Sequence, residues 1–242
     1  VDDFKNLRAY TRFLLYLSAV AIILLGVLDL LRFDSFIWVP LFIVLLGAVN
    51  TYNFMDGING ITALYSFTFL VSSYFILEGL GEHEFLTGIV LYCSFFVAFS
   101  FFNVRKRALM FLGDSGSVAM GLFSAFVVVL IGIKLSNWTP ILLLSVYGVD
   151  SVGTIIIRLI KKENVLKAHR SHLYQDLVHL KNRSHLQIST IYALVQLVVN
   201  GVFYLLLDDP NLQYYAIGIL LGLGFTFVIL KRNIYGKLLF ER

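Results

Sequence analysis

Apolar residues fill most of the chain in long runs that are separated by short polar segments. There are eight such runs, and each is near the roughly 20 residues that cross about 30 Å of hydrocarbon as a helix. Alternating ten-residue strands are not seen, so we expect helices, which satisfy their backbone groups internally. The pattern predicts an all-α fold, a polytopic transmembrane helical bundle of about eight spans. The runs cover approximately residues 13–31, 36–52, 61–79, 85–102, 116–133, 139–160, 188–207 and 212–230.

The composition supports a membrane protein. The 242 residues are 59% hydrophobic and 14% charged, against about 45–50% and about 25% in soluble domains. The single cysteine, Cys93, lies inside an apolar run, so a disulfide framework is not possible. No linker or low-complexity tract divides the sequence. Residues 1–242 are therefore predicted to form a single integral membrane domain.

The basic residues indicate which helix ends face the cytoplasm, because lysine and arginine concentrate there. If the N-terminal end is cytoplasmic and each run crosses once, 17 of the 19 lysines and arginines fall on the inner side. They lie at helix ends without a soluble domain to present them, so a nucleic-acid partner is not expected. Four polar segments are predicted to share the cytoplasmic side: residues 1–12, 53–60, 103–117 and 161–187.

The segment 53–60 is a polar interruption between two apolar runs. It contains Asn53, Asp56 and Asn59 together with two glycines, Gly57 and Gly60. Glycine permits tight turns and a close approach of backbone to a ligand, and the other three side chains supply hydrogen-bond donors and acceptors. An Asn-Gly turn that joins two helices is the simpler interpretation.

The other cytoplasmic segments add groups that suit phosphate chemistry. Carboxylates can hold Mg²⁺, arginine and histidine donate to phosphate oxygens, and a helix start offers free N–H groups. Each group alone could be a helix cap or an orientation signal, so the inference rests on their sharing one side. The groups are Asp2 and Asp3, then Asp114 and Ser115 in a Gly-Asp-Ser-Gly-Ser sequence, then His169, Arg170 and His172 in the long loop.

Asp150 lies within the run 139–160, and a carboxylate inside a membrane is costly enough to indicate a function. Arg158 follows eight residues later, about 12 Å along a helix. The two side chains are too far apart for a direct pair, so Asp150 needs another partner, which the sequence does not name.

These motifs, in this order, resemble those of the polyprenyl-phosphate N-acetylhexosamine-1-phosphate transferases, a family of the glycosyltransferase family 4 type. The resemblance covers the whole chain. It rests on Asp2-Asp3, Asn53-x-x-Asp56-Gly57-x-Asn59-Gly60, Phe111-Leu112-Gly113-Asp114-Ser115-Gly116-Ser117, Asp150 with Arg158, and His169-x-x-His172.

The resemblance implies transfer of a sugar-1-phosphate from a UDP-N-acetylhexosamine to a polyprenyl (undecaprenyl) phosphate, with release of UMP. It implies Mg²⁺ as the cofactor, with Mn²⁺ as a substitute, in a bacterial inner membrane with the site on the cytoplasmic face. This would be the first membrane step of cell-envelope polysaccharide synthesis. The implied roles are metal binding by Asp114, catalysis by Asp2, Asp3 and Asp56, and substrate binding by Asn53, Gly57, Asn59, Ser115, Asp150, His169, Arg170 and His172.

The chain also departs from the family pattern. The family carries further spans ahead of its Asp-Asp motif, so we expect this chain to be truncated at its N-terminus. The loop reads His169-Arg170-Ser171-His172 instead of consecutive histidines, which favours the GlcNAc or O-antigen branch. The sugar, the polyprenol length, a homodimeric state and the activity of this chain alone stay open.

Two alternatives come from other functional classes. A transporter would suit the intramembrane Asp150, but transporters often contain paired repeats, and none is visible here. A non-catalytic membrane scaffold would tolerate changes at Asp56 and Asp114. The clustering of polar residues at one side of the membrane favours the enzyme.

Overall fold

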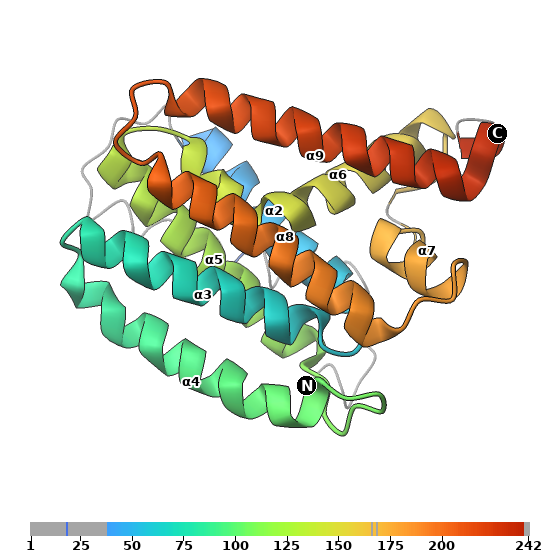
Figure 1. Cartoon of the computed structure of the whole chain (residues 1–242), viewed down its shortest axis with the longest axis horizontal. Coiled ribbons are helices and arrows are strands. Elements are labelled where there is room, and N and C mark those ends of the chain that lie inside the picture. The colour runs from blue at the N-terminus through green and yellow to red at the C-terminus, as the bar shows by residue number, and fades with distance from the viewer. Residues whose placement is uncertain (1–17, 19–37, 166, 168, 240–242) are drawn as a thin grey trace.

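The described part of the chain is helical. The computed structural model describes Ser18 and residues 38–165, 167 and 169–239, and none of these residues forms a strand (Figure 1). The α-helices are α2 (Trp38–Met55), α3 (Ile61–Gly79), α4 (Leu86–Asn103), α5 (Gly113–Leu135), α6 (Ser145–Ile160), α7 (Leu173–His179), α8 (His185–Leu205) and α9 (Leu212–Tyr235). The 3-10 helices are η1 (His83–Phe85), η2 (Thr139–Leu144) and η3 (Gly236–Leu239).

Six helical segments in the described residues are long and apolar enough to cross a membrane. They confirm six of the predicted runs, with some ends shifted by a few residues. The predicted run 36–52 overlaps α2, which is not among the six, and the run 13–31 lies outside the described residues, so the count of eight stays a prediction. The six segments are Ile61–Gly79, His83–Asn103, Gly113–Leu135, Thr139–Ile160, His185–Leu205 and Leu212–Tyr235.

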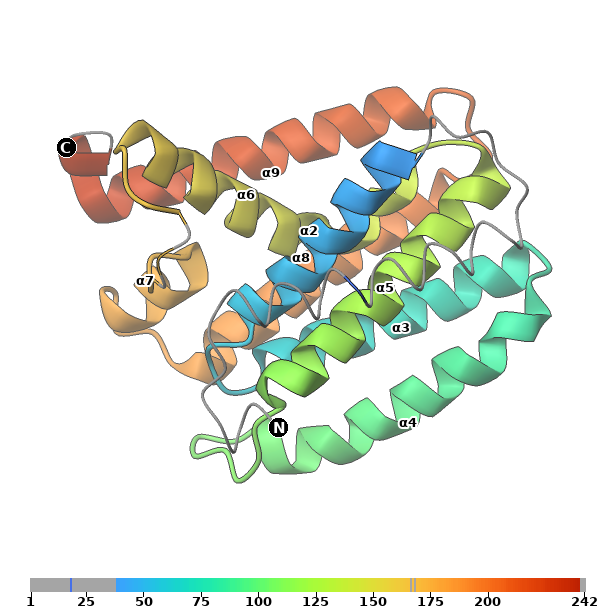
Figure 2. The ribbon, with the colours of Figure 1, turned by 180° about the vertical axis from the view of Figure 1, so that it is seen from behind.

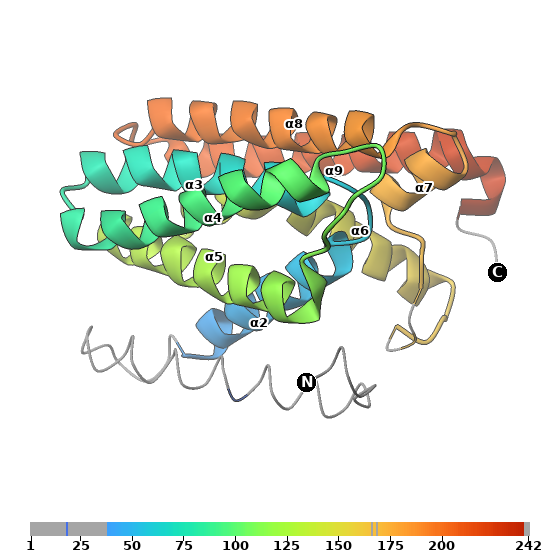
Figure 3. The ribbon, with the colours of Figure 1, turned by 90° about the horizontal axis from the view of Figure 1, so that it is seen from below.

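The packing of the helices brings the predicted polar segments together. Helix α2 packs chiefly on α5, α3 packs on α4 and α8, and α6 pairs with α9. Figures 2 and 3 show the α2–α3 turn, the start of α5 and helix α7 at the same end of the bundle. Three of the four predicted polar segments therefore meet there, and the fourth, residues 1–12, lies outside the described residues.

The segment 161–187, which we expected to be a loop, contains a helix. Helix α7 occupies Leu173–His179, and α8 begins at His185, three residues before the predicted run. At the start of α8, Ser184 and Gln187 cap one another: each backbone N–H donates to the other's side-chain oxygen at 3.2 Å. This Ser-x-x-Gln capping box precedes an apolar run, so it is a signal in the sequence itself.

Gln196 of α8 closes a break in a neighbouring membrane helix. Where η2 passes into α6, the side-chain nitrogen of Gln196 donates to the carbonyl of Leu142 at 2.7 Å. The side-chain oxygen of Gln196 accepts from the N–H of Val146 at 3.0 Å and from the hydroxyl of Tyr65 at 2.6 Å. Backbone groups without partners are costly in an apolar medium. The fully buried Gln196 thus replaces the bonds that the break removes.

We therefore expect Gln196→Leu to destabilise the bundle. The substitution would leave the N–H of Val146 and the hydroxyl group of Tyr65 without their acceptor, each costing about 1–3 kcal/mol, and would remove one of the two donors to the Leu142 carbonyl. Thermal unfolding in detergent would measure the loss. Gln213→Leu, at an exposed position of α9, is the matched control, and equal melting temperatures for the two variants would contradict the role of Gln196.

Candidate active site

Asp56 lies in the turn between α2 and α3, at the end of the bundle where the polar segments meet. Its carboxylate accepts a hydrogen bond from the hydroxyl of Thr62 at 2.7 Å. Burial raises the pKa of Asp56 to about 6, the Thr62 hydrogen bond opposes that rise, and the negative charge of Asp114 adds to it. A carboxylate of the α2–α3 turn and one of α5 therefore lie close enough to repel one another.

Asp114 lies in the first turn of α5 and is joined to α2 by Asn53. The side-chain amide of Asn53 donates to Oδ1 of Asp114 at 3.2 Å and to the hydroxyl of Ser117 at 3.3 Å. The amide orients the carboxylate, and carboxylate oxygens are the type of ligand that divalent cations such as Mg²⁺ bind. Ser115 is exposed in the same turn.

The partners of Asp150 are the first backbone groups of α7. Its carboxylate accepts from the N–H of Leu173 at 2.8 Å and from the N–H of Tyr174 at 3.2 Å. The hydroxyl of Tyr192 donates to it at 2.7 Å, and Nδ1 of His172 lies 3.5 Å away. A carboxylate at a helix N-terminus is stabilised by free N–H groups and by the helix dipole. Asp150 therefore holds the C-terminal part of the His-Arg-Ser-His sequence.

Arg158 holds the other side of the same loop. Its buried guanidinium donates to Oε2 of Glu163 at 2.9 Å and to the carbonyl of Asn164 at 2.8 Å. It also contacts the carbonyls of Val165 and Lys167, at 3.4 and 3.3 Å. Asp150 and Arg158 do not pair; each binds a different stretch of the loop. Both buried charges of α6 thus serve to position this loop.

The loop folds over the α2–α3 turn. The exposed ring of Phe54 stacks on His172 with ring centroids 5.9 Å apart, and His169 lies 6.4 Å from Phe54. The hydroxyl of Tyr174 donates to the carbonyl of Phe54 at 2.9 Å. Burial lowers the pKa of His169 to about 4, and electrostatic interactions with His172 and Arg158 contribute. At neutral pH the imidazole of His169 is uncharged, and the exposed Arg170 carries the permanent positive charge of this sequence.

Asn59 joins three segments at the base of the site. Its side-chain amide donates to the carbonyls of Arg105 and Lys106, at 3.1 and 3.2 Å. Its own carbonyl accepts from the hydroxyl of Ser189 at 2.8 Å, and its N–H donates to Nδ1 of His185 at 3.3 Å. These contacts hold the 103–112 segment and α8 against the α2–α3 turn. Substrate binding by Asn59 stays a prediction.

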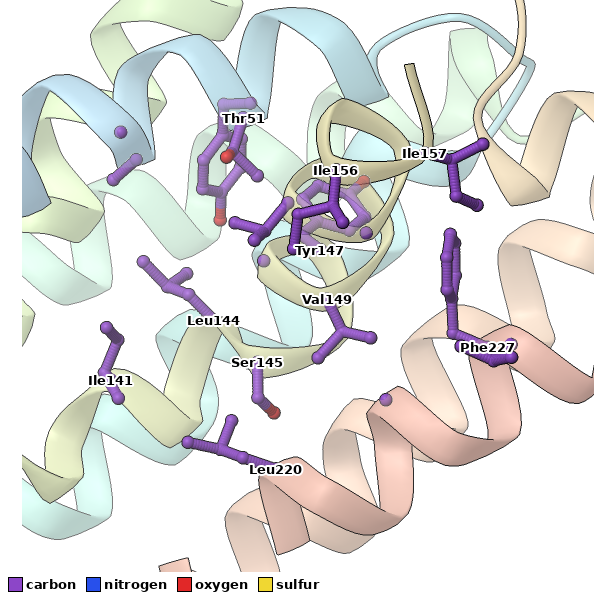
Figure 4. A pocket seen from close by; sticks show the side chains of 18 residues that line it. Thr51, Ile141, Leu144, Ser145, Tyr147, Val149, Ile156, Ile157, Leu220 and Phe227 are labelled. Atoms are coloured by element: carbon purple, nitrogen blue, oxygen red, sulfur yellow. The ribbon is translucent and has the colours of Figure 1, made fainter. Parts of the chain in front are cut away.

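An apolar cavity of about 660 Å³ lies between α2, α6 and α9. Figure 4 shows Leu144, Val149 and Ile156 on one side of it, with Leu220 and Phe227 on α9 opposite. Thr51 and Tyr52 also line the cavity, and they directly precede Asn53. The apolar cavity and the polar site are therefore neighbours along α2.

Comparison with known proteins identifies the family. Residues 1–132 match the family model described as Glycosyl transferase family 4. The chain belongs to this family. The match includes the segments with Asn53, Asp56 and Asp114, and it also covers Asp2 and Asp3, which lie outside the described residues.

Several curated relatives carry related names. The chain is 26% identical to the phospho-N-acetylmuramoyl-pentapeptide-transferase of Thermotoga neapolitana, covering 82% of this chain and 70% of the relative. It is 27% identical to the protein of that name from Lacticaseibacillus paracasei, covering 71% and 56%. It is 26% identical to a probable undecaprenyl-phosphate N-acetylglucosaminyl 1-phosphate transferase of Bacillus subtilis, covering 80% and 58%. The chain thus spans a little more than half the length of two of these relatives.

The structure brings several of the predicted family 4 site residues together and adds others that the sequence analysis missed. Asn53 and Asp114 are bonded, Asp56 lies near them, and His169 and His172 lie over Phe54. Thr62 and Tyr192 were missed because they look like ordinary residues of apolar runs, and Phe54 and Tyr174 because they stand beside residues with clearer chemistry. Nothing in the sequence marks them, since only the folded chain brings Thr62 to Asp56, Tyr174 and Tyr192 to Asp150, and Phe54 to His172.

Gly57 leaves the space that Tyr174 occupies. A Cβ atom at position 57 would lie 2.1 Å from the hydroxyl oxygen and 3.1 Å from Cζ of Tyr174, and the Tyr174 ring is fully buried. We expect Gly57→Ala to displace α7 and to cost about 1–3 kcal/mol, as overpacking of a filled site does. Thermal unfolding in detergent measures the cost.

Gly201→Ala is the control for this experiment, because no atom lies within 4 Å of a Cβ at position 201. Tyr174→Phe should recover part of the loss in the Gly57→Ala background, because it removes the nearest clashing atom. Full stability of Gly57→Ala, or no recovery in the double variant, would show that the two residues do not compete for this space.

Proposed function

We propose that this protein transfers a sugar-1-phosphate from a UDP-N-acetylhexosamine to a polyprenyl phosphate and releases UMP. The observation that carries the proposal is the meeting of Asp56 and Asp114 with the histidine loop, residues 161–172, at one end of a membrane bundle. The names of the family 4 relatives support the same reaction class. A transporter gains no support, because these carboxylates lie at a bundle end and not at the midplane expected for a transport site.

The proposed reaction replaces one phosphoanhydride bond with another, so that polyprenyl phosphate takes the place of UMP on the sugar phosphate. An oxygen of the polyprenyl phosphate attacks the β-phosphorus of the UDP-sugar. A new P–O bond forms as the bond from that phosphorus to the bridging oxygen breaks, and UMP leaves with the electron pair. Positioning and charge neutralisation supply most of the catalysis in such transfers. A lipid phosphate is already ionised at neutral pH, so the metal-binding role ranks above that of a base.

The donor set fits Mg²⁺, with Mn²⁺ as a substitute. Asp114, oriented by Asn53, is the proposed ligand, and the negative charge of Asp56 is close enough to interact with it. Among the described residues no three His, Cys, Asp or Glu side chains form a metal group, so water and phosphate oxygens would complete the shell, as is usual for this ion. A bound Mg²⁺ would neutralise diphosphate charge. Asn53 would keep the carboxylate in place, and Arg170 would bind phosphate oxygens.

The apolar cavity would take part of the polyprenyl chain. Its lining is aliphatic and aromatic, so an isoprenoid chain that enters from the bilayer would exchange contacts with lipid tails for apolar contacts of the same kind. Since Thr51 and Tyr52 precede Asn53 on α2, a chain in this cavity would carry its phosphate toward the carboxylates. We further propose a bacterial inner membrane, a cytoplasmic site, and the GlcNAc or O-antigen branch. Homodimers remain a prediction from the family.

Asp114→Asn should abolish transfer while the protein stays folded in detergent. The neutral amide loses the charge that binds a divalent cation. We would measure transfer of label from UDP-N-acetylhexosamines into undecaprenyl phosphate, with UMP release, across a series of Mg²⁺ concentrations. Asp208→Asn, at an exposed position between α8 and α9, controls for loss of a surface charge. Near-normal Mg²⁺-dependent turnover by Asp114→Asn would rule out the assignment.

Gly224→Phe should raise the Michaelis constant for polyprenyl phosphate and leave that for the UDP-sugar nearly unchanged. Gly224 lines the cavity and has no neighbour within 4 Å of a Cβ, so the new ring would fill the space. Gly222→Phe is the matched control. A Cβ at Gly222 also has no atom within 4 Å, and Gly222 lies on the same helix, but it is exposed and does not line the cavity. The cavity would not be the lipid site if both variants behaved alike.

A further inference from the structure

Helix α7 is held by a second buried charge that is not on α6. Asp176, in the first turn of α7, is 3% exposed, and its partner is Lys231 of α9, which is 2% exposed. The Lys231 ammonium lies 2.6 Å from Oδ2 of Asp176. Charged side chains are almost never this buried unless they are paired. The contact joins positions 55 residues apart, so it fastens the last long helix to the histidine loop.

Lys231 also binds the backbone of the His-Arg-Ser-His sequence itself. Its ammonium donates to the carbonyl of Ser171, the residue between Arg170 and His172. Tyr235, one turn further along α9 and on the same face, donates its hydroxyl to Oδ1 of Asp176 at 2.9 Å. Both oxygens of the Asp176 carboxylate are thus bound from α9. The loop residues proposed to bind substrate are therefore held by α9 as well as by α6.

The next residue of α9, Arg232, shows that basic residues at this end of the helix are not buried in general. Arg232 is exposed, as expected for a basic residue that only marks the cytoplasmic end of a membrane helix. Lys231 points inward instead, where it has two oxygen partners. An orientation signal would not require a desolvated ammonium, because a long basic side chain can reach the interface.

We propose that Lys231 is a positioning residue: through Asp176 and the carbonyl of Ser171, it fixes His169, Arg170 and His172 for the sugar nucleotide. This inference rests on the proposed function. It assigns to α9 a part in substrate binding that is separate from the cavity wall formed by Gly224 and Phe227. The Lys231 ammonium holds Asp176 and Ser171 through its charge and its N–H donors. A neutral side chain of similar length would keep the packing of α9 but would lose both of these contacts.

The first test is the amide hydrogen exchange of residues 171–180 in detergent, which is independent of turnover. We expect Lys231→Met to speed exchange of this segment about tenfold relative to wild type, because local opening becomes easier. Arg232→Met is the control and should leave the exchange unchanged. Equal exchange in the two variants would overturn the proposal. Tyr235→Phe, which removes one hydroxyl, should give a smaller change in the same direction and replaces Lys231→Met if that variant does not fold.

The second test separates the apparent Michaelis constants of the two substrates. Lys231→Met should raise the apparent Michaelis constant for the UDP-sugar about tenfold and the constant for polyprenyl phosphate less than about twofold. Lys231→Arg should bring the constant for the UDP-sugar part of the way back to the wild-type value. A general loss of stability would lower the amount of active protein and leave both constants unchanged, which would overturn the positioning role. Absence of transfer by wild type would refute the proposed function, and the exchange measurement would still decide the attachment.

Discussion

The organisation of the site depends on one buried carboxylate that accepts the first N–H groups of a short helix. Asp150 is costly inside a membrane protein unless hydrogen bonds replace the water that it loses. Leu173 and Tyr174 of α7 supply those bonds, and Tyr192 adds another. An isolated helix of seven residues would not be stable in water. The Asp150 carboxylate therefore depends on the N–H groups of α7, and α7 depends on the carboxylate. The hydrogen bonds between them set the position of the histidine loop.

Three buried charges act on this loop from two helices. Arg158 binds its first part and Asp150 the start of α7, both from α6, while Lys231 binds Ser171 and Asp176 from α9. The exposed Arg170 and the half-buried His169, which carry part of the proposed chemistry, are thus held by a set of buried polar contacts. Such a set is stable only when every member is satisfied. This explains why the second half of the chain, beyond the residues that match the family model, bears directly on the site.

The sequence predicted the membrane class, six of the spans and the meeting of three of the four polar segments at one end, because apolar length and the side on which a segment falls can be read from the sequence alone. It also identified Asp150 as unusual, but it could not name the partners, since backbone N–H groups of α7 have no signature in the residue letters. Helix α7 itself was missed: seven residues within a polar loop give no clear periodicity, and a carboxylate from another helix starts it. Lys231 was read as an orientation signal, because burial of a lysine is decided by tertiary contacts.

The burial of the Lys231–Asp176 pair has a consequence for behaviour in solutions of different ionic strength. Mobile ions screen exposed charges over about 10 Å at 0.1 M salt, but they screen buried pairs much less. Both partners here are almost fully covered, while Arg170 and the basic residues Arg105, Lys106 and Arg107 are exposed. Concentrated salt would thus weaken the long-range attraction of the proposed anionic nucleotide to this end of the molecule, yet the segment with His169 and His172 would stay docked.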